Sequence, residues 1–419
     1  MTEFIRVLDL YAQKRYDEFE MILTQEIKSD RAKAFEFLKY CLQSSGSTKI
    51  VTPHELIYYV SPDRFIEIFA FCLPALGLNY KEAERSGISL QHYLLEHLSW
   101  QAPGLFHTHL ENIWEKSVDE LAQAWQDSGE IHHTRLVECL EDESRASEHR
   151  QALLRLELSN CVAGFELARQ YGKPQDTIWM VVDDEWKNVP NTQGLYLLET
   201  AGVEFRDGSW HRLYNTASYH FKFPEEALEA HNSQANEHMK LNDDSWKLTS
   251  TADTIRYGGV GSAGCPICER ESHHLFTLKT APAGFDITTP IVFESCLYCM
   301  MSSRPMYAHH DDSGRPTIEP SYQVFERTYE PKPLQEMTVS LSQTPDRFYR
   351  QEWSGVQNLS RLGGPATWIQ GPEHEICPSC NKRMLFLSQL GDGIDYIHTT
   401  IYIFWCNSCR ISAVLNTYT

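Results

Sequence analysis

Four Cys-x-x-Cys pairs constrain what this chain can fold into more than any other feature of its sequence. In the last stretch, Arg361 to Thr419, two such pairs are separated by 25 residues. Between them lie two candidate strands, 384–390 and 399–405, on either side of a Gly-Asp-Gly turn. A hairpin of this kind brings two thiolate pairs into the tetrahedral four-sulfur arrangement that suits Zn²⁺. The pattern therefore predicts a zinc ribbon.

The same plan occurs once before in the chain, in a first copy with 27 residues between its pairs. Both copies have Gly-Gly upstream and begin with Cys-Pro-x-Cys, so we interpret them as an internal duplication with a period of about 110 residues. We expect two structural zinc ions, with iron or a redox role as the alternative, because four thiolates leave no open position at a metal. The predicted ligands are Cys265, Cys268, Cys296, Cys299, Cys377, Cys380, Cys406 and Cys409.

The hydrophobic periodicity predicts an α+β chain. Apolar residues recur at helical spacing over 3–42 and over 144–171, where Gly172 provides a stop signal. From residue 177 short apolar runs alternate with turn residues, which is typical of strands. We predict an all-α helical domain followed by a β-rich duplicated domain with two zinc ribbons. The predicted bounds are 1–175, 176–419 and, for the two half-domains, about 176–310 and 311–419.

The remaining four of the 12 cysteines stand alone in apolar stretches that we expect to be helical. We interpret Cys41, Cys72, Cys139 and Cys161 as small buried apolar residues. The first nine residues do not resemble a signal peptide, and no run of about 18 apolar residues occurs. We therefore expect a cytoplasmic protein without membrane association, in which paired cysteines bind metal instead of forming disulfides.

Several histidines were candidates for further sites. His309-His310-Asp311-Asp312 is the most ligand-like cluster outside the cysteines, and it falls in a segment, 306–333, that we expect to be an irregular loop. A hydrolytic metal site there is disfavoured because adjacent residues point apart. His273 and His274 could replace a thiolate but are expected to be solvated in a loop, and His132-His133 is expected at the surface or at an interface.

The charge balance favours a basic protein partner. With 37 basic and 57 acidic residues the net charge is −20, which repels polyanions and attracts basic proteins. Acidity that merely aids solubility is the alternative, and the acidic stretch 138–148 could equally be a solvated helix start. The predicted partner-binding residues are Glu138, Glu141, Asp142, Glu143, Glu148, His309, His310, Asp311 and Asp312.

No motif of an enzyme is recognisable. The sequence has no nucleophile elbow, no phosphate loop, no dinucleotide-binding glycine fingerprint and no His-Glu-x-x-His. The stretch Gly258 to Gly264 is glycine-rich, but it lacks the Lys-Ser/Thr of a phosphate loop and is expected to be a simple loop. We therefore predict no catalytic residues and no enzymatic activity.

The last 59 residues resemble a known superfamily. Their ordered motifs are similar to those that unite bacterial YwqG-like proteins with eukaryotic programmed cell death protein two and its relatives. The first copy lacks the Trp-x-Gln element, and the N-terminal half is not covered. The resemblance rests on Gly363-Gly364-Pro365, Trp368-Ile369-Gln370, Cys377-Pro378-x-Cys380, Met384-Leu385-Phe386-Leu387-Ser388-Gln389-Leu390 and Ile401-Tyr402-Ile403-Phe404.

What the resemblance implies is protein binding. Eukaryotic members are chaperones for a ribosomal protein, and bacterial members are often encoded near polymorphic toxins, which suggests immunity. Together with the charge, this predicts a cytosolic immunity protein that occludes a toxin effector, a basic nuclease. Two alternatives remain: a chaperone for a ribosomal or other basic client, and a nucleic-acid-binding zinc-ribbon protein whose binding would weaken steeply with salt.

Overall fold

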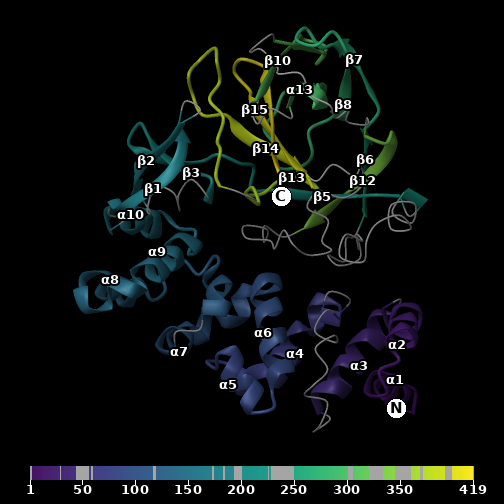
Figure 1. Cartoon of the computed structure of the whole chain (residues 1–419), viewed down its shortest axis with the longest axis vertical. Coiled ribbons are helices and arrows are strands. Elements are labelled where there is room, and N and C mark those ends of the chain that lie inside the picture. The colour runs from purple at the N-terminus through teal and green to yellow at the C-terminus, as the bar shows by residue number, and fades with distance from the viewer. Residues whose placement is uncertain are drawn as a thin grey trace. The chain divides into compact units, whose positions relative to one another are not determined.

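The chain forms two compact units, and most of their helices and strands are labelled in Figure 1. Unit 1 comprises Met1–Leu197 with Asp244–Lys247, and unit 2 comprises Leu198–Asp243 with Leu248–Thr419. The computed structural model describes residues 2–28, 30–43, 56–57, 60–116, 119–171, 174–182, 185–192, 201–224, 226–227, 250–300, 305–319, 334–344, 360–368, 371–391 and 399–418.

Unit 1 consists of short helices followed by a hairpin. Its α-helices are α1 (Thr2–Ala12), α2 (Tyr16–Ile22), α3 (Arg31–Gln43), α4 (Phe65–Cys72), α5 (Tyr80–Arg85), α6 (Ser89–Gln101), α7 (Leu110–Glu115), α8 (His133–Glu141), α9 (His149–Leu158) and α10 (Val162–Tyr171). Other helical turns are η1 (Leu23–Lys28), η3 (Pro62–Arg64), η4 (Leu73–Ala75), η5 (Pro103–His109), η6 (Asp119–Trp125) and η7 (Glu143–Glu148). The antiparallel hairpin is formed by β1 (Pro174–Val182) and β2 (Glu185–Thr192). None of the described helices is both long and apolar enough to cross a lipid bilayer.

The helical segment predicted over 3–42 is divided into three helices that pack through aromatic rings. The rings of Phe4 and Phe37 meet edge to face at 5.2 Å, which joins α1 to α3. Those of Tyr11 and Phe19 meet in the same way at 5.2 Å, which joins α1 to α2. Such aromatic pairs add about 0.5–1.5 kcal/mol beyond the apolar area that they bury. The helical periodicity in the sequence therefore comes from three separate helices, whose apolar faces pack against each other.

The single helix predicted over 144–171 is wrong, because the chain breaks between α9 and α10. Asn160 has a left-handed φ of 53°, which no α-helix accommodates. The hydroxyl of Ser159 donates to the carbonyl oxygen of Leu156 at 2.6 Å and so offers the backbone an alternative to helical hydrogen bonding. Neither glycine nor proline marks the break, which is why the sequence pattern did not predict it.

Unit 2 is organised around one large antiparallel sheet. Its strands are β5 (Ser218–Lys222), β6 (Ser250–Tyr257), β7 (Val260–Gly264), β8 (Glu271–Leu278), β9 (Ile291–Ser295), β10 (Met306–His310), β11 (Pro316–Ile318), β12 (Met337–Thr344), β13 (Arg361–Gly363), β14 (Leu385–Leu390), β15 (Thr399–Cys406) and β16 (Ile411–Tyr418). They follow the order β11-β10-β16-β15-β14-β13-β5-β12-β6-β8-β7, with β9 also paired to β8. A separate hairpin joins β3 (Val203–Arg206) to β4 (Ser209–Arg212), and a short helix, α13 (Leu297–Met300), follows β9. The predicted α+β class, with helices before a β-rich part, is confirmed.

The sheet is buried on both faces around β15. Ile401, Ile403 and Trp405 pack into one apolar core, and Tyr402 and Phe404 pack into another, because successive side chains of a strand point to opposite faces. None of these five side chains is more than 3% exposed. A strand covered on both faces has a continuous apolar sequence instead of an alternating one, and this is the sequence of 401–405.

The two copies of the cysteine plan are interleaved in this sheet. The first copy contributes β5, β6, β8 and β9, and the second contributes β12, β13, β14 and β15. Strand β6 lies between β8 of its own copy and β12 of the other, whereas β13 lies between β14 of its own copy and β5 of the other. Strands β5 and β12 pair with each other at the centre. Each copy therefore supplies its first strand to the half of the sheet that the other copy builds. The half-domain boundary predicted near residue 310 falls at the end of β10.

Each Gly-Gly pair lies where the backbone of one copy closely approaches the backbone of the other. Gly258 follows β6 with a φ of 68°, and a Cβ added there would lie 2.1 Å from the carbonyl oxygen of Gln335, just before β12. Gly363 ends β13 with the same φ, and its added Cβ would lie 2.0 Å from the carbonyl oxygen of Ala217, just before β5. The second glycine of each pair donates its N–H to the other copy's backbone, at 2.7 and 2.8 Å. Only glycine permits both this backbone conformation and this close approach.

Two segments predicted to be loops contain strands. Within 306–333, β10 pairs with β11 and with β16, and residues 320–333 lie outside the described residues. Met306, Ala308 and His310 are buried on one face of β10, so an alternating pattern is present although its composition is polar. The glycine-rich stretch 258–264 contains β7, which pairs irregularly with β8.

Candidate metal centres

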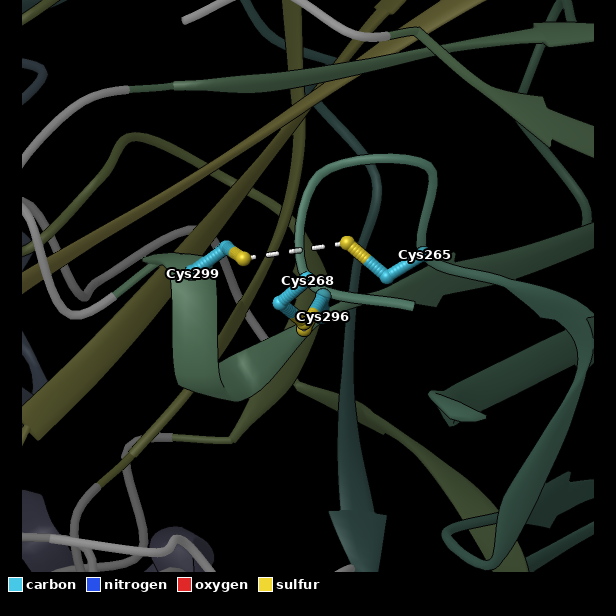
Figure 2. Close-up of side chains that lie close together, drawn as sticks. All are labelled: Cys265, Cys268, Cys296 and Cys299. Carbon is cyan, nitrogen blue, oxygen red and sulfur yellow. Dashed lines mark hydrogen bonds between the residues drawn. The ribbon is translucent and has the colours of Figure 1, made fainter. Parts of the chain in front are cut away.

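The first four-cysteine cluster joins the two ends of the β8–β9 hairpin. Cys265 and Cys268 lie in the turn between β7 and β8, Cys296 follows β9, and Cys299 lies on α13. Figure 2 shows the sulfur atoms of Cys299 and Cys265 facing each other, and 3.7 Å separates them. The sulfur atoms of Cys268 and Cys296 are 3.6 Å apart. The hairpin thus brings together four thiols that are far apart in the sequence.

The second cluster repeats this arrangement at the β14–β15 hairpin. Cys377 and Cys380 precede β14, Cys406 ends β15, and Cys409 lies in the turn to β16. The sulfur atoms of Cys380 and Cys406 are 3.7 Å apart. In both clusters all four ligand atoms lie within 4.8 Å of one another. In the part of the chain that the structure describes, these are the two groups of three or more metal-ligating side chains.

The sulfur separations fit a tetrahedral metal site. A zinc–sulfur bond of about 2.3 Å places the corners of a tetrahedron about 3.8 Å apart, whereas the sulfur atoms of a disulfide are about 2.05 Å apart. The separations of 3.6 and 3.7 Å match the first geometry. Each cluster can therefore hold one metal ion through four thiolates. Such a centre has no position left for water or a substrate.

Three of the four cysteine pairs are bent by the same kind of turn. The residue after the second cysteine is left-handed in each, with φ values of 63° at Glu269, 58° at Asn381 and 52° at Arg410. At the first two positions its N–H donates to the carbonyl oxygen of the first cysteine at 2.9 Å. This turn points both thiols of a pair to the same side. The pair that contains Cys299 is built on a turn of α13 instead.

Crowding of the thiols changes their acidity. Hydrogen bonds from the thiols of Cys296 and Cys299 hold the pKa of Cys265 far below its ordinary value, and the same contacts raise the pKa of both partners. In the second cluster a backbone hydrogen bond from Lys382 lowers the pKa of Cys380 to about 7. Four thiolates cannot be held together without compensating positive charge, which a divalent cation supplies.

The histidines after the first pair are not in a solvated loop, so that prediction is wrong. Both lie on β8 and are buried, because the apolar run after them continues the strand. The ring of His274 lies 2.7 Å from the carbonyl oxygen of Gly258 and 2.7 Å from the hydroxyl of Thr277. Nδ1 of His273 accepts a hydrogen bond from the backbone N–H of Leu297 at 3.3 Å. His273 therefore holds the start of α13, the helix that carries Cys299.

A serine hydroxyl beside the second cluster was not predicted. The hydroxyl oxygen of Ser408 lies 3.4 Å from the sulfur of Cys406 and 3.8 Å from that of Cys409. It can donate to one thiolate and so spread part of the negative charge of the cluster. The signal in the sequence is its place inside the last Cys-x-x-Cys pair, which keeps it within reach of both sulfur atoms.

The acidic residues predicted to contact a partner lie on unit 1, at the end of α8 and in η7. Asp142 accepts a hydrogen bond from the N–H of Ser144 at 2.9 Å and thereby caps η7, and the side-chain bond from the same serine lowers the pKa of Asp142. Glu141 accepts from the hydroxyl of Tyr171 at 2.7 Å. Among the described residues, Glu138 and Glu143 have no such partner. The exposed or partly exposed members are Glu138, Glu141, Asp142, Glu143 and Glu148.

The second predicted contact region, His309 to Asp312, is the end of β10 and the turn after it. His309 and both aspartates are exposed. His310 is buried: Nε2 lies 2.9 Å from the hydroxyl of Ser412, and the ring meets Trp405 edge to face at 5.0 Å. Burial lowers the pKa of His310 to about 4. A side chain inside the core cannot reach a partner, which removes His310 from the predicted contact residues.

Comparison with known proteins adds one distant similarity. The chain is 26% identical over 164 residues to the uncharacterized protein YpfL of Salmonella typhimurium (strain LT2). The match covers 36% of this chain and 37% of that protein. No family model matches the chain, and no solved structure matches it. The resemblance to the YwqG-like superfamily therefore stays a prediction.

Proposed function

We propose that this chain is a binding protein whose unit 2 is held together by two structural Zn²⁺ ions. The observation that carries the proposal is the closed four-sulfur geometry of both clusters, with sulfur separations of 3.6 and 3.7 Å. Zinc accepts this geometry readily, and each structural zinc contributes on the order of 10 kcal/mol of apparent folding free energy. Centres of this kind have a structural role, so we expect the function of the protein to depend on binding at its surface.

The surface favours a basic partner. The net charge is −20, and residues 101–150 alone contain eleven acidic and four basic side chains. Glu138 and Glu143 are exposed in this stretch and have no ion-pair partner among the described residues. Acidic side chains without an internal partner can neutralise lysine and arginine on another protein and speed its association.

The partner that we propose is a basic toxin effector, a nuclease, which the chain would occlude as an immunity protein. A nuclease has a positively charged groove that follows a phosphate backbone. Carboxylates at the spacing of phosphates can occupy such a groove and exclude the nucleic acid. The same charge supports a second candidate, a chaperone that covers a ribosomal or other basic client, and the identity of the partner distinguishes the two.

The test is co-purification of the tagged chain from its native host at low and moderate salt, with zinc measured in the same sample. We expect one stoichiometric basic protein and two zinc ions per chain. A toxin encoded beside this chain supports immunity, and a ribosomal protein supports the chaperone. Recovery of nucleic acid without a protein partner would refute both.

A matched pair of variants tests the proposed surface. Glu138→Gln with Glu143→Gln should weaken partner binding by about ten-fold, because exposed interfacial charges act mainly on association. Glu26→Gln with Glu36→Gln makes the same change in net charge at other exposed positions of unit 1. Equal weakening by the two pairs would show that only overall charge matters and would remove the patch from the proposal.

A further inference from the structure

Cys161 lies at the junction of α8, α9 and α10, in a setting unlike that of any other cysteine in the chain. It immediately precedes α10, and its sulfur accepts a hydrogen bond from the backbone N–H of Gly164 at 3.4 Å. A sulfur in this capping position faces the positive end of the helix dipole, which stabilises the negative charge that develops on sulfur during a nucleophilic attack. The sequence predicted a buried apolar residue, but the side chain is partly exposed.

A buried imidazole faces this sulfur. His133 is the first residue of α8 and is 8% exposed, so it lies inside unit 1 and not, as predicted, at the surface or at an interface. Its Nε2 is 4.0 Å from the sulfur of Cys161 and 3.1 Å from the hydroxyl of Ser159. The same hydroxyl lies 3.5 Å from the sulfur. Burial lowers the pKa of His133 and so favours the neutral ring, the form with a free nitrogen lone pair.

The backbone around the three side chains fixes their positions. His132 and Asn160, which precede His133 and Cys161, are both left-handed, with φ values of 63° and 53°. A Cβ at Gly164 would lie 2.3 Å from the hydroxyl oxygen of Ser159, so this glycine lets α10 approach closely. Two separate turns of the backbone therefore place the thiol, the imidazole and the hydroxyl next to each other.

The other cysteines differ in chemistry. Eight belong to the two metal clusters, where a metal ion would protect their thiolates. Burial raises the pKa of Cys41 to about 12 and also raises the pKa of Cys72 and Cys139, so these remain protonated. Of the 12 cysteines, Cys161 is the one that is partly exposed, outside a metal cluster and next to a base.

We propose that Cys161 is a reactive thiol that exchanges with small-molecule disulfides, with His133 as its base. The thiol proton moves to Nε2 of His133 while the sulfur attacks one sulfur of the disulfide. The disulfide bond breaks, a mixed disulfide forms on Cys161, and the leaving thiolate takes the proton from His133. The small disulfide is the oxidant and is reduced to one thiol. Modification changes the sulfur that caps α10 and places the new group at the α8–α10 junction.

The test is the reaction of the folded, zinc-loaded chain with an aromatic disulfide that releases a coloured thiolate. We expect one fast thiol per chain, without release of zinc. Cys161→Ser keeps the capping acceptor and should abolish the fast phase, and Cys139→Ala should leave it unchanged. A fast phase that survives Cys161→Ser, or that is accompanied by zinc release, overturns the proposal.

A second set of variants tests the base. His133→Gln should slow the fast phase by about ten-fold, less than the 10²–10⁴ of an ideally placed base because the contact is long. For His133→Ala, added imidazole should restore part of the lost rate, which a purely structural role would not permit. If both variants keep the native circular dichroism and react at the wild-type rate, His133 is not the base and the proposal fails in that part.

Discussion

Replacing Gly258 with alanine should destabilise unit 2 by about 3 kcal/mol. The left-handed backbone at this position, with a φ of 68°, costs an L-residue roughly 1–2 kcal/mol. The new Cβ would also lie 2.1 Å from the carbonyl oxygen and 2.7 Å from the carbonyl carbon of Gln335. These are backbone atoms and cannot rotate away, so relief requires moving the segment before β12, and overpacking of this kind costs about 1–3 kcal/mol.

Gly208→Ala is the matched control. Gly208 is also left-handed, with a φ of 77°, but no atom lies within 4 Å of the position of an added Cβ. It should lose only the backbone contribution, roughly 1–2 kcal/mol. Thermal unfolding of the zinc-loaded chain measures both variants, since 1 kcal/mol shifts the midpoint of a unit this size by about 2–4 °C. If Gly258→Ala costs no more than Gly208→Ala, the two copies do not cross at this glycine, and the interleaving described above is incorrect.

Two further predictions concern the metal centres and pH. Native mass spectrometry should find two zinc ions on the chain and, at saturating zinc, one on Cys380→Ser, whereas Cys161→Ser should keep two; two ions on Cys380→Ser would contradict the second centre. His310, with its pKa lowered from 6.5 to about 4, is protonated in the unfolded chain before it is protonated in the folded one. Its stabilising effect is therefore complete above pH 6.5 and is lost as the pH falls toward 4, and the loss relative to high pH is about 2 kcal/mol at pH 5. Urea unfolding at pH 8 and pH 5 should show a smaller loss for His310→Asn than for the wild type, and equal losses would refute the assignment.

Local chemistry explains what the sequence could predict. The strands predicted at 384–390 and 399–405 coincide closely with β14 and β15, because their apolar runs are local signals, and the predicted turn at 392–393 lies outside the described residues. The clusters followed from the spacing of the cysteines. The strands at 306–318 were missed, since His, Asp and Pro are typical of loops, and the burial of His310 depends on Trp405, almost a hundred residues away.

The pairing of the two copies had no local signal. Nothing in β5 indicates that its neighbours in the sheet are β12 and β13, and such long-range pairings are decided by the whole fold. The Trp-x-Gln element, of which residues 369–370 lie outside the described residues, follows a segment of the second copy that covers Arg361. The guanidinium of Arg361 donates to the hydroxyl of Thr367 at 3.0 Å. The corresponding Arg256 of the first copy, which lacks the element, is exposed and pairs with Glu336 at 3.0 Å.

Because each copy supplies its first strand to the other half of the sheet, binding of a metal ion at one centre should be thermodynamically linked to binding at the other. Loss of the ion at one centre loosens a hairpin, and that hairpin supports the strand, β6 or β13, on which the first strand of the other copy rests. Binding of an ion at one centre would therefore also stabilise the strands of the other centre. By reciprocity, each bound ion would raise the affinity of the other centre for its own ion. A chelator would then remove the two ions in a cooperative transition, and both halves of the sheet would lose their order at the same concentration of free metal.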